Sequence, residues 1–241
     1  MDLLLLGYPD QAREQSARVM LAAQMRRHAP TTGWCMSAVC RVFALLRDKI
    51  QFARAVEEFD ALAAAQEFPL WLAQSTAYRG WASLGGGNDE QSIALLKKGV
   101  ADYKATGALF WLPFLMSLLA SGYRAVGAAC SEQRALDEAL ALAGETGEAW
   151  FVPELHRLKG LALSTDQVEA EQRLQYALEM ARGQACMLWQ LRTGGSLARL
   201  WRDQGKRAEA RDLLAPVYGW FTEGFDTLDL KEAKALLDEL A

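Results

Sequence analysis

Residues that could carry out chemistry are few in this sequence, and their spacing does not suit a metal site. The two histidines, His28 and His156, are far apart in the chain and do not form the His-Glu-x-x-His zinc motif. Cys35 and Cys40 are five residues apart, a separation that puts two side chains on divergent faces of a helix rather than into a chelate. We therefore expect no metal and no other cofactor.

Two further patterns resemble catalytic motifs only in part. The stretch from Gly194 to Ala198 is one residue off a Gly-x-Ser-x-Gly nucleophile elbow, and it lacks the strand–turn–helix context that exposes such a serine. The glycine run at 85–87 leads into Asn88 and Asp89, and an acidic residue there would repel phosphate. We expect that the chain is not an enzyme.

Composition and charge narrow the class of protein further. Of the 241 residues, 51% are hydrophobic and 23% are charged, so the chain can bury a core. The net charge of −4 lacks the basic balance that nucleic-acid binding favours. The uncharged stretch at 109–120 is shorter than the ~20 residues of a membrane-spanning helix, and the amino terminus has no positive n-region. We expect a cytoplasmic protein that binds neither nucleic acid nor membrane.

The sequence contains an internal repeat of about 40 residues, and its elements position the side chains considered above. Two sets of turn signals divide each period into segments of about 16–18 residues, which is the length of a helix. Apolar residues at intervals of three and four, such as Ile93, Leu96 and Val100, predict amphipathic helices. Five tryptophans mark the period at intervals of 37, 40, 39 and 39 residues: Trp34, Trp71, Trp111, Trp150 and Trp189.

Small residues around the turns indicate the kind of helical repeat. Gly80 lies seven residues before the turn at Gly87, and Ser92 lies five residues after it. A small residue also lies seven before the turns at Gly127 and Gly205, and one lies five after other turns, including the turn at 164–166. Small side chains at these points let two antiparallel helices approach closely, and the pattern resembles the tetratricopeptide (TPR) repeat. We predict an all-α, TPR-like α-α superhelix of about six hairpins with a C-terminal capping helix.

The turns also predict the domain organisation. We expect one repeat domain over 1–241, with units at about 1–29, 30–68, 69–107, 108–147, 148–185 and 186–225 and a cap at 226–241. Only six residues precede Gly7, so the first hairpin is incomplete, in a naturally shortened chain or in a piece of a longer one. The apolar residues Leu3–Leu6 are then an exposed repeat face, through which we expect a homo-oligomer to form.

Six longer strings of residues lie at 67–73, 79–82, 103–108, 154–160, 196–200 and 216–227, and together they resemble one bacterial family. They are similar to the C-terminal TPR region of multidomain signalling proteins, which carry a class III adenylate/guanylate cyclase domain or a DNA-binding domain, then a P-loop ATPase module, then this superhelix. The resemblance covers nearly the whole chain and is strongest from Trp150 onward. Residues 186–195 depart from the family pattern, and Leu228 replaces a usual proline.

A TPR superhelix binds its partners on the concave face, which the first helix of each hairpin lines. Arginine forks there suit the carboxylates of a peptide or an anionic ligand. The same arginines can instead pair with Glu154, Asp203 and neighbouring acids as a solvated lining. In register with the small residues, we expect ten side chains in this groove: Gln74, Trp81, Phe114, Ser121, Arg124, Glu154, Arg157, Arg192, Arg199 and Arg202.

These observations predict a non-catalytic scaffold for protein–protein interaction that binds a protein or peptide partner. The resemblance implies the C-terminal regulatory or oligomerising arm, or a stand-alone remnant, of a bacterial cyclase/ATPase signalling protein. The alternative is a small-ligand-binding regulatory module that uses the aromatic and arginine side chains of the concave groove.

Overall fold

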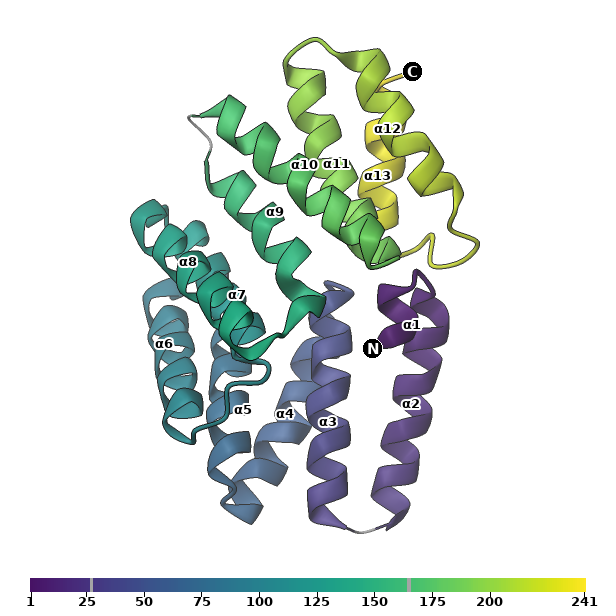
Figure 1. The fold of residues 1–241 in the computed structure, drawn as a ribbon. Helices are drawn as coiled ribbons and strands as arrows, with labels where there is room; N and C mark the ends of the chain where they lie inside the picture. Colours follow the sequence, from purple (N-terminus) through teal and green to yellow (C-terminus); the bar gives the residue numbers. More distant parts are fainter. Residues whose placement is uncertain (27, 164–165) are drawn as a thin grey trace. The chain divides into compact units, whose positions relative to one another are not determined.

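The computed structural model describes residues 1–26, 28–163 and 166–241. Over these ranges the chain forms thirteen α-helices and one short 3-10 helix, without a strand (Figure 1). The prediction of an all-α protein is therefore confirmed. Of the predicted turn at 164–166, Ser164 and Thr165 lie outside the described residues. Among the described helices, none combines the length and the apolar character that crossing a membrane requires.

Helices that follow one another within each unit pack against each other. The most extensive contacts join α5/α6, α7/α8, α9/α10 and α11/α12, followed by α4/α5, α3/α4, α10/α11 and α6/α7. The helices are α1 (Asp2–Leu5), α2 (Pro9–Arg26), α3 (Ala29–Leu45), α4 (Lys49–Gln66), α5 (Pro69–Ala82), α6 (Asp89–Ala105), α7 (Leu112–Ala125), α8 (Ala129–Thr146), η1 (Ala149–Phe151), α9 (Val152–Ala162), α10 (Gln167–Gly183), α11 (Met187–Asp203), α12 (Arg207–Gly219) and α13 (Leu228–Glu239).

Contacts between the helices divide the chain into two compact units. The middle unit consists of Ser16–Phe151 and includes α3 to α8. The end unit combines Met1–Gln15 with Val152–Ala241, so it contains both ends of the chain and includes α9 to α13. Because the two units have separate sets of contacts, each is described by itself.

Local sequence explains where several helices begin. The side chains of Asp48, Asn88 and Asp166 accept hydrogen bonds from backbone N–H groups in the first turns of α4, α6 and α10. Such caps satisfy donors that have no partner within the helix. Pro69 and Pro113 stand in the first turns of α5 and α7, where proline removes no helical hydrogen bond.

Helices α5 and α6 of the middle unit approach each other through two glycines. A Cβ atom on Gly80 would lie 2.7 Å from the backbone nitrogen of Leu96 and 2.7 Å from the carbonyl oxygen of Ser92. A Cβ atom on Gly99 would lie 2.4 Å from the backbone nitrogen of Ala77. The role predicted for small residues beside the turn is thus confirmed in this hairpin, because a larger side chain would clash with backbone.

The first residues of the chain pack within the end unit. Leu4 is 2% exposed, and α1 contacts α11. A Cβ atom on Gly7 would lie 2.5 Å from the Trp220 ring, and the Cys186 thiol donates to the carbonyl oxygen of Leu5 at 3.3 Å. The expectation of an open apolar face at Leu3–Leu6 is therefore corrected, since the C-terminal hairpin covers part of it; Leu6 remains 45% exposed.

The start of α2 is tied to the loop that follows α12 in the same unit. Glu223 accepts hydrogen bonds from the backbone N–H groups of Asp10 at 3.0 Å and Gln11 at 3.1 Å. Asp10 in turn accepts from the N–H of Gly224 at 2.9 Å, and Arg13 pairs with Asp226 at 2.9 Å. A carboxylate at the positive end of a helix and a reciprocal bond fix this junction.

Candidate functional site

In the middle unit, two of the predicted groove residues are buried in contacts between helices. Gln74 on α5 and Phe114 on α7 are 3% and 2% exposed. The Gln74 side-chain oxygen accepts from the Ser37 hydroxyl of α3 at 2.8 Å, and its amide nitrogen donates to the Tyr78 hydroxyl at 2.9 Å. Both the oxygen and the nitrogen of the Gln74 side chain are therefore hydrogen-bonded inside the protein.

The other three predicted residues of this unit are partly exposed and also have partners. The Trp81 indole N–H on α5 donates to the Ser121 hydroxyl on α7 at 3.0 Å. Arg124 pairs with the buried carboxylate of Glu132 through Nε at 2.7 Å. Trp81 and Ser121 therefore join the first helices of neighbouring hairpins.

In the end unit, three predicted residues belong to a buried network of charges. Arg157 donates to both oxygens of Glu154, each at 2.7 Å, and to the Ser196 hydroxyl at 3.2 Å. Arg192 lies 2.8 Å from Asp229 and 3.6 Å from Glu154. Burial opposes the charge of Arg192, but the carboxylates of Asp229 and Glu154 raise its pKa overall.

The remaining arginines of α11 pair closer to the surface. Arg199 pairs with Glu232 at 3.5 Å, and Arg202 pairs with Asp203 at 2.9 Å and with Glu239. Together with Asp229, the capping helix α13 thus supplies a carboxylate to each predicted arginine of α11. The sequence leaves open whether these arginines bind the carboxylates of a ligand or pair with neighbouring acids. In this unit the contacts favour pairing with neighbouring acids.

Sequence reasoning missed a buried arginine in the middle unit. Arg41 on α3 is 3% exposed. Its Nη1 donates to the Ser37 hydroxyl at 2.6 Å, and its guanidinium carbon lies 4.0 Å from the centre of the Trp111 ring. Its Nε has no hydrogen-bond partner, and no carboxylate of the described residues pairs with it. The signal was available, because Arg41 is the single charge between Ala29 and Leu46.

Trp111, which covers Arg41, is held by a second buried charged group. Its backbone N–H donates to Glu148 at 3.1 Å, and the indole N–H of Trp150 donates to the other oxygen of the same carboxylate at 2.7 Å. Burial raises the pKa of Glu148, although these hydrogen bonds and the charge of Arg41 lower it. Trp111 has a φ of 70°, a left-handed conformation that large side chains rarely adopt.

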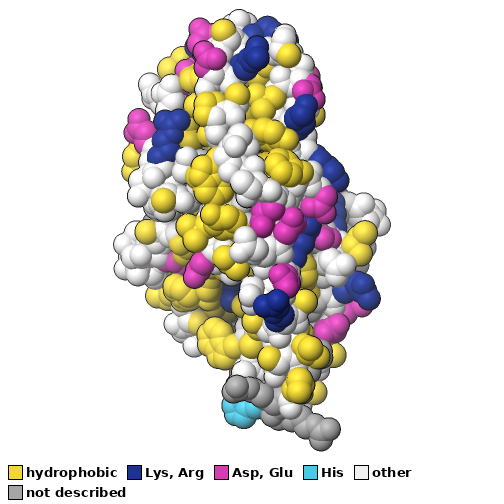
Figure 2. Space-filling model, turned by 90° about the vertical axis from the view of Figure 1, so that its right-hand side faces the viewer, with side chains coloured by type: hydrophobic (Ala, Val, Ile, Leu, Met, Phe, Trp, Pro, Cys, Tyr) yellow, Lys and Arg dark blue, Asp and Glu magenta, His cyan; other side chains and the backbone are white. Residues whose placement is uncertain are grey.

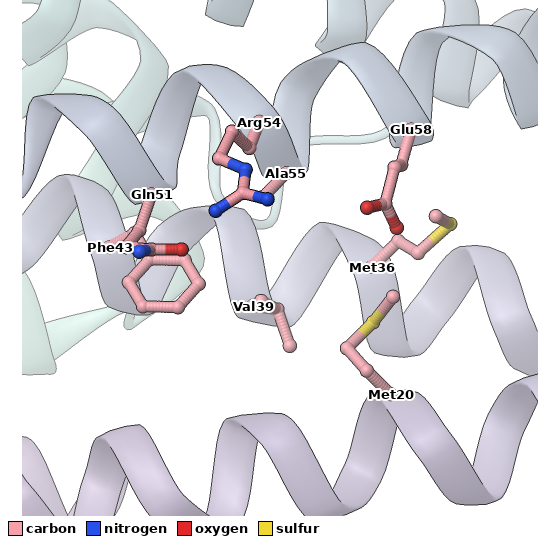
Figure 3. A pocket seen from close by; sticks show the side chains of 8 residues that line it. All are labelled: Met20, Met36, Val39, Phe43, Gln51, Arg54, Ala55 and Glu58. Atoms are coloured by element: carbon pink, nitrogen blue, oxygen red, sulfur yellow. The ribbon is translucent and has the colours of Figure 1, made fainter.

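A groove in the middle unit lies among α2, α3 and α4 (Figure 3). Its cavity measures about 300 Å³. Figure 3 shows apolar side chains from α2 and α3 on one side and Arg54 and Glu58 of α4 at the rim. Neither Arg54 nor Glu58 has an ion-pair partner among the residues described. The lining consists of Met20, Met36, Val39, Phe43, Gln51, Arg54, Ala55 and Glu58.

The described residues offer little for metal binding or nucleophilic catalysis. They contain no group of three or more histidine, cysteine or acidic side chains that could hold a metal ion. Burial raises the pKa of the Cys40 thiol to about 12 and that of Cys186 to about 11. Both thiols are therefore protonated at neutral pH and are poor nucleophiles.

Comparison with known proteins finds relatives by structure alone. No protein-family model matches the chain, and no curated protein matches it by sequence. The apo quorum sensor NprR from B. thuringiensis is similar with a TM-score of 0.61 and 12% identity, over 99% of this chain and 68% of that one. A Podosopora anserina chain with nearly identical TPR-like repeats, assigned as a kinesin light chain, has a TM-score of 0.53 and 18% identity, over 88% of this chain and 98% of that one.

A third similar structure is a signal-transduction ATPase with numerous domains (STAND) from Pyrococcus horikoshii that has a tetratricopeptide repeat sensor. Its TM-score is 0.52 at 12% identity, and the match covers 97% of this chain but 41% of that one. The neighbours share a TPR-like repeat fold, and the fold class predicted from the spacing of small residues and turns is confirmed. Identities this low show the fold alone.

Proposed function

We propose that this chain is a non-catalytic scaffold that binds a peptide segment of a protein partner in the groove of Figure 3. One observation carries the proposal: an apolar cleft is bordered by a cation and an anion that have no ion-pair partners among the described residues. Met20 and Met36 are flexible and polarisable, so they adapt to different apolar side chains. TPR-like folds commonly bind protein or peptide partners, which supports this assignment.

The chemistry of the rim defines the partner. Arg54 and Glu58 are one helical turn apart on α4, and both are exposed. A matching peptide has an apolar side chain that enters the cleft, with an acidic residue facing Arg54 and a basic residue facing Glu58. A cavity of about 300 Å³ is the size of a small ligand site, so one or two large side chains fill it.

A phage-displayed library of random dodecapeptides, panned against the full chain, tests the proposal. We expect an enriched apolar motif flanked by opposite charges, and a loss of affinity of roughly tenfold or more in Met20→Glu and in Arg54→Glu. Lys97→Glu is the matched control, because Lys97 is an exposed lysine on α6 of the same unit, away from the groove lining. Failure to enrich a motif, or equal losses in all three variants, would contradict the proposal.

We further propose that the scaffold is the C-terminal regulatory or oligomerising arm, or a stand-alone remnant, of a bacterial cyclase/ATPase signalling protein. The sequence strings at 154–160 and 216–227 support this, as does the similarity to a STAND protein whose TPR region is a sensor. Sequencing the surrounding genome tests it. We expect a class III cyclase domain or a P-loop ATPase module to be encoded in the same or the adjacent reading frame; neighbours of neither kind would argue against this role.

A second function, binding of a small anionic ligand, is favoured by the buried Arg41 beneath Trp111. Thermal unfolding of the full chain with a panel of nucleotides and anionic metabolites tests it. We expect at least one anion to raise the melting temperature of the wild type and to have no effect on Arg41→Gln. If no compound of the panel has this effect, the proposal that the chain binds a small anionic ligand is contradicted.

A further inference from the structure

Arg41 carries a buried positive charge that packing alone does not explain. A guanidinium that is 3% exposed is normally paired with an acid, because an uncompensated charge inside a protein is strongly destabilising. Here the Nε–H has no acceptor, and the described residues place no carboxylate within ion-pairing distance. The groups in contact with the guanidinium are neutral, namely the hydroxyl of Ser37 and the ring of Trp111, and the hydroxyl of Tyr78 lies nearby.

Glu148 influences Arg41 electrostatically but does not serve as its counter-ion. One of its oxygens accepts from the backbone N–H of Trp111 and the other from the indole of Trp150. The carboxylate therefore holds the loop before α7, while the indole of Trp111 lies against the guanidinium. The unit thus keeps one acid and one base buried without joining them.

We propose that Arg41 binds the carboxylate of a ligand and that Trp111 is the displaceable cover of this site. The inference rests on the ligand-binding function proposed above and narrows the ligand to a carboxylate. The planar fork of an arginine matches the two oxygens of a carboxylate, and one ligand charge neutralises one guanidinium. A phosphate carries more charge, and the single arginine beside Glu148 does not balance it.

The cover accounts for how a ligand reaches a buried group. Trp111 is half-buried, and its neighbour Phe110 is 55% exposed, so this short segment borders solvent. A tryptophan with φ of 70° is held in a strained backbone conformation, and such positions are found at ligand clamps. Movement of the indole away from Arg41 opens the guanidinium to the ligand.

Carboxylates can come from a peptide end or from a small molecule, and the experiment separates these sources. Random hexapeptides with acetylated amino ends are captured on the immobilised full chain, once with free carboxyl ends and once as carboxamides. Acetate and succinate are tested separately by thermal unfolding, with ATP as the phosphate probe. We expect one carboxylate source to bind the wild type, with the binding lost in Arg41→Gln and retained in the control Lys97→Gln, whose lysine is exposed on α6 and outside the groove lining.

The outcomes distinguish this inference from the function on which it rests. Capture of free-carboxyl peptides alone assigns a peptide end, and stabilisation by acetate or succinate alone assigns a small carboxylate. Stabilisation by ATP without any carboxylate effect leaves the ligand-binding function standing and overturns the carboxylate. Carboxylates that bind the wild type and Arg41→Gln equally also overturn it.

A measurement without ligand guards against a variant that merely fails to fold. If Arg41 awaits a counter-ion, then Arg41→Met removes an uncompensated buried charge, and we expect the melting temperature of the ligand-free chain to rise. A fall in the melting temperature would identify Arg41 as a structural residue and overturn the proposal. Trp111→Ala should bind the carboxylate probe more tightly, because the cover is absent; weaker binding would contradict the role of Trp111.

Discussion

Nη2 of Arg192 lies 2.8 Å from the Oδ2 atom of Asp229, and this ion pair joins α11 to the capping helix α13 in the end unit. The two side chains are 10% and 7% exposed. We predict that Asp229→Asn lowers the free energy of unfolding by about 3–5 kcal/mol, because the change leaves the charge of Arg192 buried with less compensation. Urea denaturation of the full chain measures the difference.

The matched control is Glu232→Gln on the same helix. Glu232 pairs with Arg199, and both side chains are more than one third exposed. Solvent screens such a pair, so the expected loss is below about 1 kcal/mol. If the two variants lose equal stability, burial is not what makes the Arg192–Asp229 pair important.

The surroundings of two helical glycines, Gly80 on α5 and Gly144 on α8, predict opposite effects of a change to alanine. Gly80→Ala places a methyl group 2.7 Å from backbone atoms of α6, and we expect a loss of about 1–3 kcal/mol from overpacking. Gly144→Ala on α8 has no atom within 4 Å of the new methyl group, and we expect a gain of up to about 1 kcal/mol from helix propensity. Thermal unfolding of both variants decides; a stabilised Gly80→Ala would refute the close packing.

His156 makes the stability of the end unit depend on pH. Burial, helped by the charges of Arg173 and Lys159, lowers its pKa from 6.5 to about 4, and its Nδ1 has no hydrogen-bond partner. The unfolded chain therefore binds a proton near pH 6.5 that the folded chain does not bind until about pH 4. The stability that the neutral His156 gives the folded chain is fully present above pH 6.5 and is lost as the pH falls from 6.5 to 4.

Urea denaturation at pH 7 and pH 4.5 measures this effect. On acidification we expect the free energy of unfolding of His156→Gln to fall by about 1–2 kcal/mol less than that of the wild type. The pKa shift alone would give a larger difference, but solvent screens part of the effect because the side chain is only half-buried. Tyr176→Phe, which keeps the ring contact at 4.8 Å, should behave as the wild type does. Identical losses in His156→Gln and the wild type would exclude His156 as the cause.

Much of the fold could be predicted from the sequence because its signals are local. Gly80 and Ser92 are near each other in the sequence, and the structure places them together between α5 and α6. The tryptophan period of about 40 residues is the length of one pair of successive helices. The helix caps at Asp48 and Asn88 are local signals of the same kind.

The candidate site was less predictable because its contacts join distant residues. The register placed Arg192 and Arg199 on α11, but their partners Asp229 and Glu232 belong to a different helix, whose rotation the sequence does not specify. Arg41 is an isolated charge in an apolar helix, and only the structure shows Trp111 lying against it. Side-chain contacts between non-adjacent helices depend on packing rather than on periodicity.

The end unit combines two segments that are far apart in the sequence, so the order in which the chain is synthesised affects when this unit can fold. Met1–Gln15 is synthesised before Ser16–Phe151, yet its partners within the unit begin at Val152. Domains generally fold as units during synthesis, so Ser16–Phe151 can fold while the leucines at the start of the chain are still without cover. Residues 1–15 are then synthesised before the middle unit but reach their native neighbours after it, and a chaperone that shields Leu3–Leu6 in that interval would raise the yield of folded protein.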